Sequence, residues 1–202
     1  ETAHKLKNPK AKPLDKSVEF MDTLLGRIRE SYRLQNEILF DTASAVAQKI
    51  GNGAHIHITS DHQGVEVEAT VVAMGPMMFN AFRKEMRPGD VHILSTIDPD
   101  TKAILAEAER ARAMGMFVVS IAPASSSGLR RLSDVFVDNL CPEGQGFFSI
   151  PGFSEKIGVM GGIMNNVLFW IFSAQLIDEM VRRGLVPYFW MGIYTAGGSE
   201  YN

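Results

Sequence analysis

The sequence has little cysteine, no excess of basic charge and no uninterrupted apolar run of the ~20 residues that a membrane span needs. Of its 202 residues only Cys141 is a cysteine, so no intrachain disulfide can form. Lys and Arg number 20 against 23 Asp and Glu, a net charge of −3, which argues against a general nucleic-acid binder. The most apolar stretch, residues 167–177, includes Ser173 and Gln175 and is followed by charged residues, so it predicts a buried helix rather than a membrane span. We therefore expect neither nucleic acid nor a membrane as partner.

The rest of the composition is that of an ordinary globular domain. Apolar residues make up 46% of the chain and charged residues 21%, and the length predicts one domain. A chain of this size buries enough surface to fold without disulfides or a structural metal. Residues 1–17, rich in lysine, predict a flexible arm, and 18–202 a single domain. We expect a cytoplasmic protein, with the alternative that a removed signal peptide preceded Glu1.

Strand-like and helix-like patterns alternate along the chain. The apolar spacing predicts helices over 18–49, 65–74, 102–114 and 157–183, and one helical turn over 129–133. Short β-rich runs predict strands at 54–59, 77–82, 91–95, 116–122 and 135–137, with a last extended piece at 186–193. This alternation predicts an α/β fold, a three-layer α/β/α sandwich with a mainly parallel sheet of about five strands.

Three polar loops follow predicted strands, where such sheets bind ligands. They span 60–64, 96–101 and 125–128, and hydroxyl-rich loops that lead into a helix suit an anion. The alternative is that Asp100 or Thr101, and the three serines, only cap the helices that follow them. The candidate ligand-binding residues are Ser60, Asp61, Gln63, Gly64, Thr96, Asp98, Asp100, Thr101, Ser125, Ser126 and Ser127.

Histidines near the first loop suggest two kinds of chemistry. His62, with Glu66 or Glu68, is a candidate acid/base pair that could shuttle a proton between adjacent carbons of a sugar. The alternative is a surface histidine beside glutamates at a helix start. His55 and His57 alternate on a strand close to His62, but no ligand-spacing motif supports a metal, so we expect no metal and no cofactor.

Several segments together resemble the SIS (sugar isomerase) domain family. They are 89–96, which begins Gly-Asp-Val, the strand at 118–121, the serine cluster, 132–139 and the C-terminal runs 184–189 and 197–202. The resemblance covers residues 20–202 and is to SIS-domain phosphosugar-binding proteins. It implies a flavodoxin-like sandwich, a sugar phosphate or related carbohydrate derivative as ligand, and a homodimer.

The chain departs from the family pattern in the loops that should hold the ligand. Residues 60–64 lack the glycines of the family's first loop, and Asp98 takes the place of a phosphate-binding serine. Two unit charges about 4 Å apart repel by roughly 4 kcal/mol at an effective dielectric of ~20, so a phosphate beside Asp98 or Asp100 is disfavoured. We therefore expect a sugar-derivative (phosphosugar-like) binding protein with an altered phosphate loop. Sugar-phosphate isomerase or lyase activity is left open, and the alternative is a non-catalytic sensor or structural dimer that has lost the site.

Overall fold

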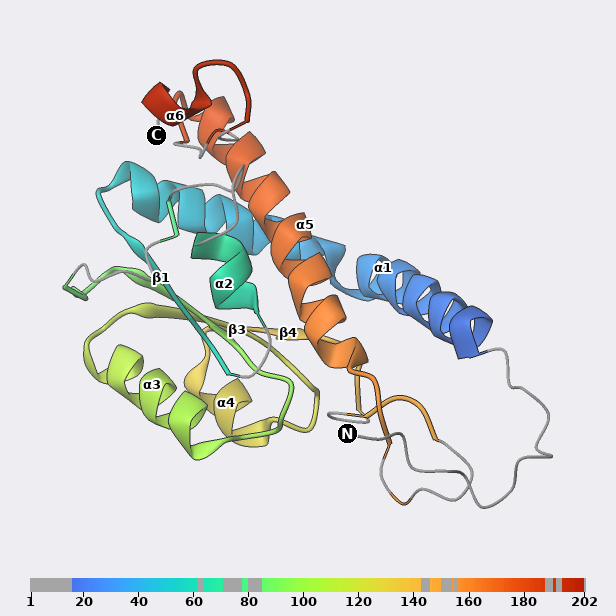
Figure 1. Cartoon of the computed structure of the whole chain (residues 1–202). Coiled ribbons are helices and arrows are strands. Elements are labelled where there is room, and N and C mark those ends of the chain that lie inside the picture. The colour runs from blue at the N-terminus through green and yellow to red at the C-terminus, as the bar shows by residue number, and fades with distance from the viewer. Residues whose placement is uncertain are drawn as a thin grey trace.

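The computed structural model describes residues 16–61, 64–70, 78–79, 85–142, 146–149, 154, 156–187, 191 and 194–201. Parallel strands form the centre of the molecule (Figure 1). They are β1 (Ile56–Ser60), β2 (Val91–Ser95), β3 (Phe117–Ala122) and β4 (Val135–Asp138), hydrogen-bonded in that order. All five residues of β2 are buried, as expected for an inner strand with helices on both of its faces.

The described sheet has four strands, so the prediction of five was wrong. Of the predicted edge strand at 77–82, Phe79 forms a single parallel bridge to Ile56 of β1, and residues 77 and 80–82 lie outside the described residues. Of the last extended piece predicted at 186–193, residues 188–190, 192 and 193 lie outside the described residues. Residues 186 and 187 belong to no strand, and Val186 is 78% exposed.

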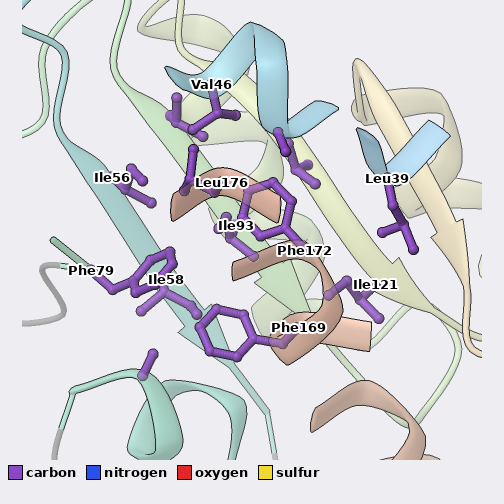
Figure 2. Close-up of a cluster of buried hydrophobic side chains, with 14 of the residues drawn as sticks. Leu39, Val46, Ile56, Ile58, Phe79, Ile93, Ile121, Phe169, Phe172 and Leu176 are labelled. Atoms are coloured by element: carbon purple, nitrogen blue, oxygen red, sulfur yellow. The ribbon is translucent and has the colours of Figure 1, made fainter. Parts of the chain in front are cut away.

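One face of the sheet is covered by the two long helices α1 (Lys16–Gly51) and α5 (Met160–Arg182). Figure 2 shows their core: Phe169, Phe172 and Leu176 of α5 meet Ile58 and Ile93 of the strands. Burying a side chain of this size stabilises the fold by about 1.5–3 kcal/mol. Close α1–α5 packing holds the N-terminal and C-terminal parts of the chain together.

The opposite face is covered by α3 (Lys102–Ala113) and α4 (Ser127–Leu132). Ile104 and Ala108 of α3 pack there against Leu94 and Val118 of the strands. A short helix, α2 (Val65–Thr70), follows β1, and α6 (Gly198–Tyr201) lies near the end of the chain. The layers are those of the predicted α/β/α sandwich (Figure 1).

Helix boundaries differ from the predictions where glycine or a local pair intervenes. Helix α1 begins at Lys16, inside the predicted arm of residues 1–17, and Lys16 pairs there with Glu19. Residues 1–15 of that arm lie outside the described residues. Helix α5 begins at Met160 instead of residue 157, because Ile157 forms an antiparallel bridge with Phe148 and Gly158 has a positive φ of 79°.

Helix α5 is long and apolar enough, by length and composition, to cross a membrane. It is the one such helix in the part of the chain that the structure describes, and 56% of its most apolar window is buried inside the protein. Core helices of soluble proteins pass the same test. The burial agrees with the prediction of a buried helix, since Leu168, Phe169 and Leu176 face the sheet.

Candidate functional site

The carboxyl ends of the parallel strands bring the three predicted loops to one edge of the sheet. After β1 the chain reaches Phe79 on the outer side of that strand, and then returns as β2 on its inner side. This change of direction places the switch point between β1 and β2, where open α/β sheets bind ligands. Asp61 follows β1, and Thr96 follows β2.

Asp61 and Thr101 join the first loop to the second. The Thr101 hydroxyl donates a hydrogen bond of 2.7 Å to Asp61 Oδ2 and accepts one from the backbone N–H of Ile104 at 3.4 Å. Thr101 is thus the N-cap of α3, which confirms one of the two interpretations of this loop. The other oxygen, Asp61 Oδ1, is buried and has no hydrogen-bond partner among the described residues. An acceptor in this state is suited to a ligand that donates a hydrogen bond.

Asp100 reaches from the second loop to the third. Its carboxylate accepts hydrogen bonds from the backbone N–H groups of Gly128 at 2.6 Å and Leu129 at 2.9 Å, and a long one from the Ser127 hydroxyl at 3.5 Å. The backbone of Asp100 is left-handed, with φ of 50°, a conformation that aspartate tolerates better than most residues. Asp100 therefore caps α4, not the helix that follows it in sequence, and its negative charge occupies the first turn of α4.

The serine loop gives few free donors to a ligand. Ser125 and Ser127 are exposed, and the Ser125 carbonyl accepts a hydrogen bond from the Ser127 N–H. Ser126 is fully buried, makes no side-chain cap to α4, and its hydroxyl has no partner within the described part of the chain. The predicted capping by these serines is therefore wrong: Asp100 does it in their place.

Thr96 and Asp98 form a tight turn at the end of β2. The Thr96 hydroxyl donates to the Asp98 carbonyl at 2.7 Å and accepts from the Asp98 N–H at 3.1 Å. Thr96 is fully buried, whereas the Asp98 side chain is half-buried. The Thr96 hydroxyl is thus used to shape the loop, and Asp98 carries the charge at its surface.

Two buried asparagines hold the start of the loops by hydrogen bonds. The sequence analysis did not name them as site residues. Asn165 of α5 donates through Nδ2 to the Ser95 hydroxyl and to the Thr96 carbonyl, both at 3.0 Å. Its Oδ1 accepts from Asn139 Nδ2 at 2.8 Å, and Asn139 Oδ1 accepts from the Cys141 N–H at 2.9 Å. The signal that could have revealed them is a polar Asn165 inside the most apolar helix of the chain.

The predicted acid/base group is only partly visible. His62 and Gln63 lie outside the described residues. Glu66 and Ser60 bond reciprocally: Glu66 Oε2 accepts from the Ser60 N–H at 3.1 Å, and the Ser60 hydroxyl accepts from the Glu66 N–H at 3.2 Å. This arrangement resembles a capping box and uses Glu66 to fix the start of α2.

Glu68 points instead toward α5. Its Oε1 accepts a hydrogen bond of 3.1 Å from Trp170 Nε1. Both residues line a groove of about 590 Å³ between α2 and α5, together with Ile163, Asn166, Val167, Ile171 and Ala174. Asn166 Oδ1 is a buried acceptor without a partner among the described residues, and its Nδ2 lies 3.7 Å from where a Cβ on Gly64 would be. The groove therefore begins at the first loop.

The strand histidines are structural in this fold. His57 Nε2 lies 3.0 Å from Asp90 Oδ2, and His92 Nε2 lies 3.0 Å from the Thr59 hydroxyl. Burial lowers the pKa of His92 to about 4; the Glu107 carboxylate opposes this, and the charges of His57 and Arg110 add to it. No group of three or more metal-ligating side chains occurs among the described residues.

Asp90, the partner of His57, is a buried carboxyl whose pKa has opposing influences. Burial alone would raise the pKa of Asp90, but hydrogen bonds from the His55 N–H, the His57 ring and the Arg87 N–H together lower it. A carboxylate held by three donors inside the protein fixes the turn before β2 to β1. This polar cluster lies at the amino ends of the strands, away from the three loops.

No protein-family model and no curated protein matches this sequence. Solved structures do match its fold over most of its length. A phosphoheptose isomerase from Francisella tularensis superposes with a TM-score of 0.56 and 12% identity, over 85% of this chain and 99% of that one. The Vibrio vulnificus NanR protein complexed with ManNAc-6P gives a TM-score of 0.55 and 12% identity, over 84% of this chain and 67% of that one. The chain has an SIS-like fold.

A third SIS-like neighbour comes from Methanococcus jannaschii, a hypothetical protein whose structure was used to infer a function of 3-hexulose-6-phosphate isomerase. It has a TM-score of 0.53 and 11% identity, over 84% of this chain and 92% of that one. These three neighbours are thus a phosphoheptose isomerase, a protein solved with ManNAc-6P, and a hypothetical protein with an inferred isomerase function. At 10–14% identity the likeness establishes the fold, and the residues of the site must decide the rest.

Proposed function

We propose that this chain is an SIS-fold protein that binds a carbohydrate derivative, and that its phosphate loop is altered so that hydroxyl groups, rather than a phosphate, dominate recognition. The observation that carries the proposal is the Asp100 carboxylate on the backbone N–H groups of Gly128 and Leu129. These are the donors that the serine loop would otherwise offer to an anion, and the protein's own carboxylate uses them. A phosphate placed there would lose those donors and meet a like charge.

What the site offers instead are acceptors and an aromatic ring. Asp61 Oδ1 and Asn166 Oδ1 are buried acceptors without a partner among the described residues, and both suit sugar hydroxyl groups as donors. The groove between α2 and α5 adds Trp170, an apolar surface for one face of a sugar ring, with the Glu68 carboxylate at its Nε1. Ligand sites commonly combine a mostly apolar wall with a few placed polar groups.

The same contacts favour binding over catalysis. Isomerisation of a sugar needs a group that takes a proton from one carbon and returns it to the next. Glu66 is bonded to Ser60 and Glu68 to Trp170, so both predicted acid/base carboxylates have structural partners. A sensor or binding subunit needs no such group. We accordingly place the non-catalytic reading first and sugar-phosphate isomerase or lyase activity second.

The deciding experiment is calorimetric titration with matched pairs of ligands, each sugar with and without its phosphate. The panel contains hexoses, heptoses and N-acetylated hexosamines. We expect the wild-type chain to bind at least one free sugar as tightly as its phosphate ester. A phosphate ester that binds tenfold or more tightly than the free sugar, a difference of about 1.4 kcal/mol, contradicts the altered loop.

Two variants test the carboxylates separately. Asp98→Ser removes the half-buried charge at the loop surface. Asp100→Ser removes the carboxylate that accepts from the backbone N–H groups of Gly128 and Leu129, and so frees those donors for a ligand. Each should strengthen phosphate-ester binding, roughly 5-fold or more, while leaving the free sugar unchanged. The matched control is Asp178→Ser, which breaks a surface pair with Arg182 far along α5. If Asp98→Ser weakens binding of a phosphate ester, Asp98 is a ligand or an acid/base group and the chain is better described as an enzyme.

We also propose that the protein works as a homodimer. Large apolar side chains remain exposed on α1, on α5 and after it, among them Tyr32, Leu34, Ile163 and Val181. Exposed apolar side chains on these helices are candidates for the surface that a second copy would cover. Sedimentation at micromolar concentration should give a species of twice the chain mass of 22.3 kDa, and a single species of the chain mass contradicts the proposal.

A further inference from the structure

Helix α5 carries apolar residues on two of its sides. One side packs against the sheet, through residues such as Leu168 and Leu176. The other side borders the groove between α2 and α5, and its residues follow at intervals of four, three and four: Ile163, Val167, Trp170 and Ala174. This second side remains open, since Ile163 is 39% exposed and Ala174 is also exposed. Apolar surface that stays open on a folded domain is typical of a ligand groove or an interaction site.

Polarity in this groove is divided along its length. Asn166 stands at the loop end, where its Nδ2 lies 3.7 Å from the position of a Cβ on Gly64, and its Oδ1 is a buried acceptor without a partner among the described residues. From Asn166 the groove follows α5 for eight residues to Ala174, about 12 Å along the helix. Trp170 lies between them, and because its Nε1 donates to Glu68 Oε1, its ring is left as an apolar wall. A ligand that fills the whole groove is therefore polar near the first loop and apolar toward Ala174.

The charge of the groove restricts the polar end of such a ligand. Glu68 is the one charged side chain among the described residues that line the groove. A carboxylate or phosphate head would meet a like charge there, with no cation among those residues to offset it. Sugar hydroxyl groups, in contrast, can donate to Asn166 Oδ1 and to the Glu68 carboxylate. Fatty acids and phospholipids therefore fit this groove poorly, whereas an uncharged, hydroxylated head fits it.

We infer that the ligand of this chain is an amphiphilic glycoside, with an uncharged sugar head at Asn166 and Trp170 and an apolar aglycone that lies along α5 over Ile171 and Ala174. The groove of about 590 Å³ has the size of sites for small organic ligands, roughly 300–1,000 Å³. The inference rests on the proposed function and extends it, because it assigns the apolar end of the groove to a part of the ligand that a simple sugar lacks.

The first experiment varies the length of the aglycone. Calorimetry measures the affinity of the wild-type chain for methyl, butyl, hexyl and octyl β-glycosides of glucose and of N-acetylglucosamine, all below the concentrations at which they form micelles. Affinity should rise about twofold to fourfold for each added CH2, the gain expected between half and full burial. The 1-alkanols of the same chain lengths, which have no sugar head, should bind more weakly. A glycoside series without any gain in affinity overturns the inference.

The second experiment tests where the aglycone lies. Ala174→Asp places a charge at the far end of the groove, at an exposed position that the fold tolerates. It should weaken binding of the octyl glycosides about tenfold or more, because their chain would meet a hydrated carboxylate, and leave the methyl glycosides unchanged. The matched control is Ala106→Asp, also exposed, on α3 at the opposite face of the sheet. Octyl glycosides bound equally by all three proteins overturn the inference.

The remaining outcomes separate the inference from the proposals above. Free sugars that bind as tightly as their octyl glycosides overturn the inference and leave the proposed function standing. Alkanols that bind as tightly as the glycosides contradict the proposed function, since the sugar head then contributes nothing, while a gain with chain length still supports the apolar site. Sedimentation of the same variants tests the other occupant: if Ala174→Asp dissociates a wild-type assembly and no chain-length gain is found, a second copy covers the groove and the inference is wrong.

Discussion

The Asp100 carboxylate lies 2.6 Å from the backbone nitrogen of Gly128, twenty-eight residues further along the chain. The lack of a side chain at residue 128 favours that approach. A Cβ there would lie 2.9 Å from Asp100 Oδ2, closer than real Cβ contacts, and a tight 3.0 Å from its Cγ, so the carboxylate would have to shift. Gly128 and Asp100 therefore function as a pair, in which the glycine admits the carboxylate to the first turn of α4.

Gly128→Ala should accordingly destabilise the fold. The new methyl group pushes the Asp100 side chain away and costs its hydrogen bonds to the Gly128 and Leu129 N–H groups, roughly 1.5–3 kcal/mol for a charged acceptor. Urea unfolding followed by circular dichroism measures the loss. The control is Gly26→Ala in α1, where a Cβ meets nothing within 4 Å and alanine should stabilise the helix by about 0.5–1 kcal/mol. Equal stability of the two variants would show that Asp100 does not hold α4.

Asn165 makes the second structural prediction. Asn165→Leu keeps the branching and the number of side-chain heavy atoms at a 1% exposed position but leaves the Thr96 carbonyl and Asn139 Nδ2 without their partner. Unpaired buried polar groups cost about 1–3 kcal/mol each, so the free energy of unfolding should fall by roughly 2–4 kcal/mol. Asn52→Leu, at an exposed position after α1, is the control and should change little. A stability of Asn165→Leu within about 0.5 kcal/mol of wild type would mean that this network contributes little to the site.

Sequence patterns predicted the positions of the strands and loops better than the hydrogen-bond partners of individual side chains. The apolar run of β2 fixed its bounds, Val91–Ser95, because a strand buried on both faces has a continuous signal. Thr101 was correctly expected among the caps of α3, since its partner Ile104 is three residues away. Contacts within one helical turn are visible as spacing, and contacts between separate elements are not.

Asp100 and Asn165 illustrate the second case. Asp100 was expected either to cap the helix that follows it or to repel a phosphate, and it caps α4 through Gly128 and Leu129. Asn165 hydrogen-bonds to Thr96 and Ser95, which lie 69 and 70 positions earlier in the sequence, so no local pattern predicts these bonds. Each bond depends on how β2, β3 and α5 converge at one edge of the sheet, which only the three-dimensional arrangement supplies.

Glu68 and Trp170 provide a test of the ligand groove. In a Trp190→Phe background Trp170 is the one remaining tryptophan, so its emission reports on the groove. A sugar that binds there should change that emission, and Glu68→Gln should weaken binding about tenfold, because it removes a charged acceptor beside the ring. The control is Glu109→Gln, an exposed carboxylate on α3. Calorimetric binding with unchanged emission would place the sugar elsewhere.

His92 makes the stability of the fold depend on pH in a defined window. Its folded pKa is about 4, against 6.5 for the free side chain, so the unfolded chain takes up a proton as the pH falls below 6.5 while the folded protein does not. Folding stability should therefore decrease between pH 6.5 and 4, by about 3 kcal/mol in total, and stop decreasing from this source below pH 4. Asp90 acts in a lower window: its folded pKa lies below 3.8, so its contribution is lost only as the pH falls below that value.

Urea unfolding at several pH values measures both of these pH dependences of the folding stability. His92→Gln removes the titrating group and should flatten the dependence between pH 6.5 and 4, whereas His55→Gln, at a half-buried position, should retain it. A slope of equal size in wild type and His92→Gln would assign the acid sensitivity to another group.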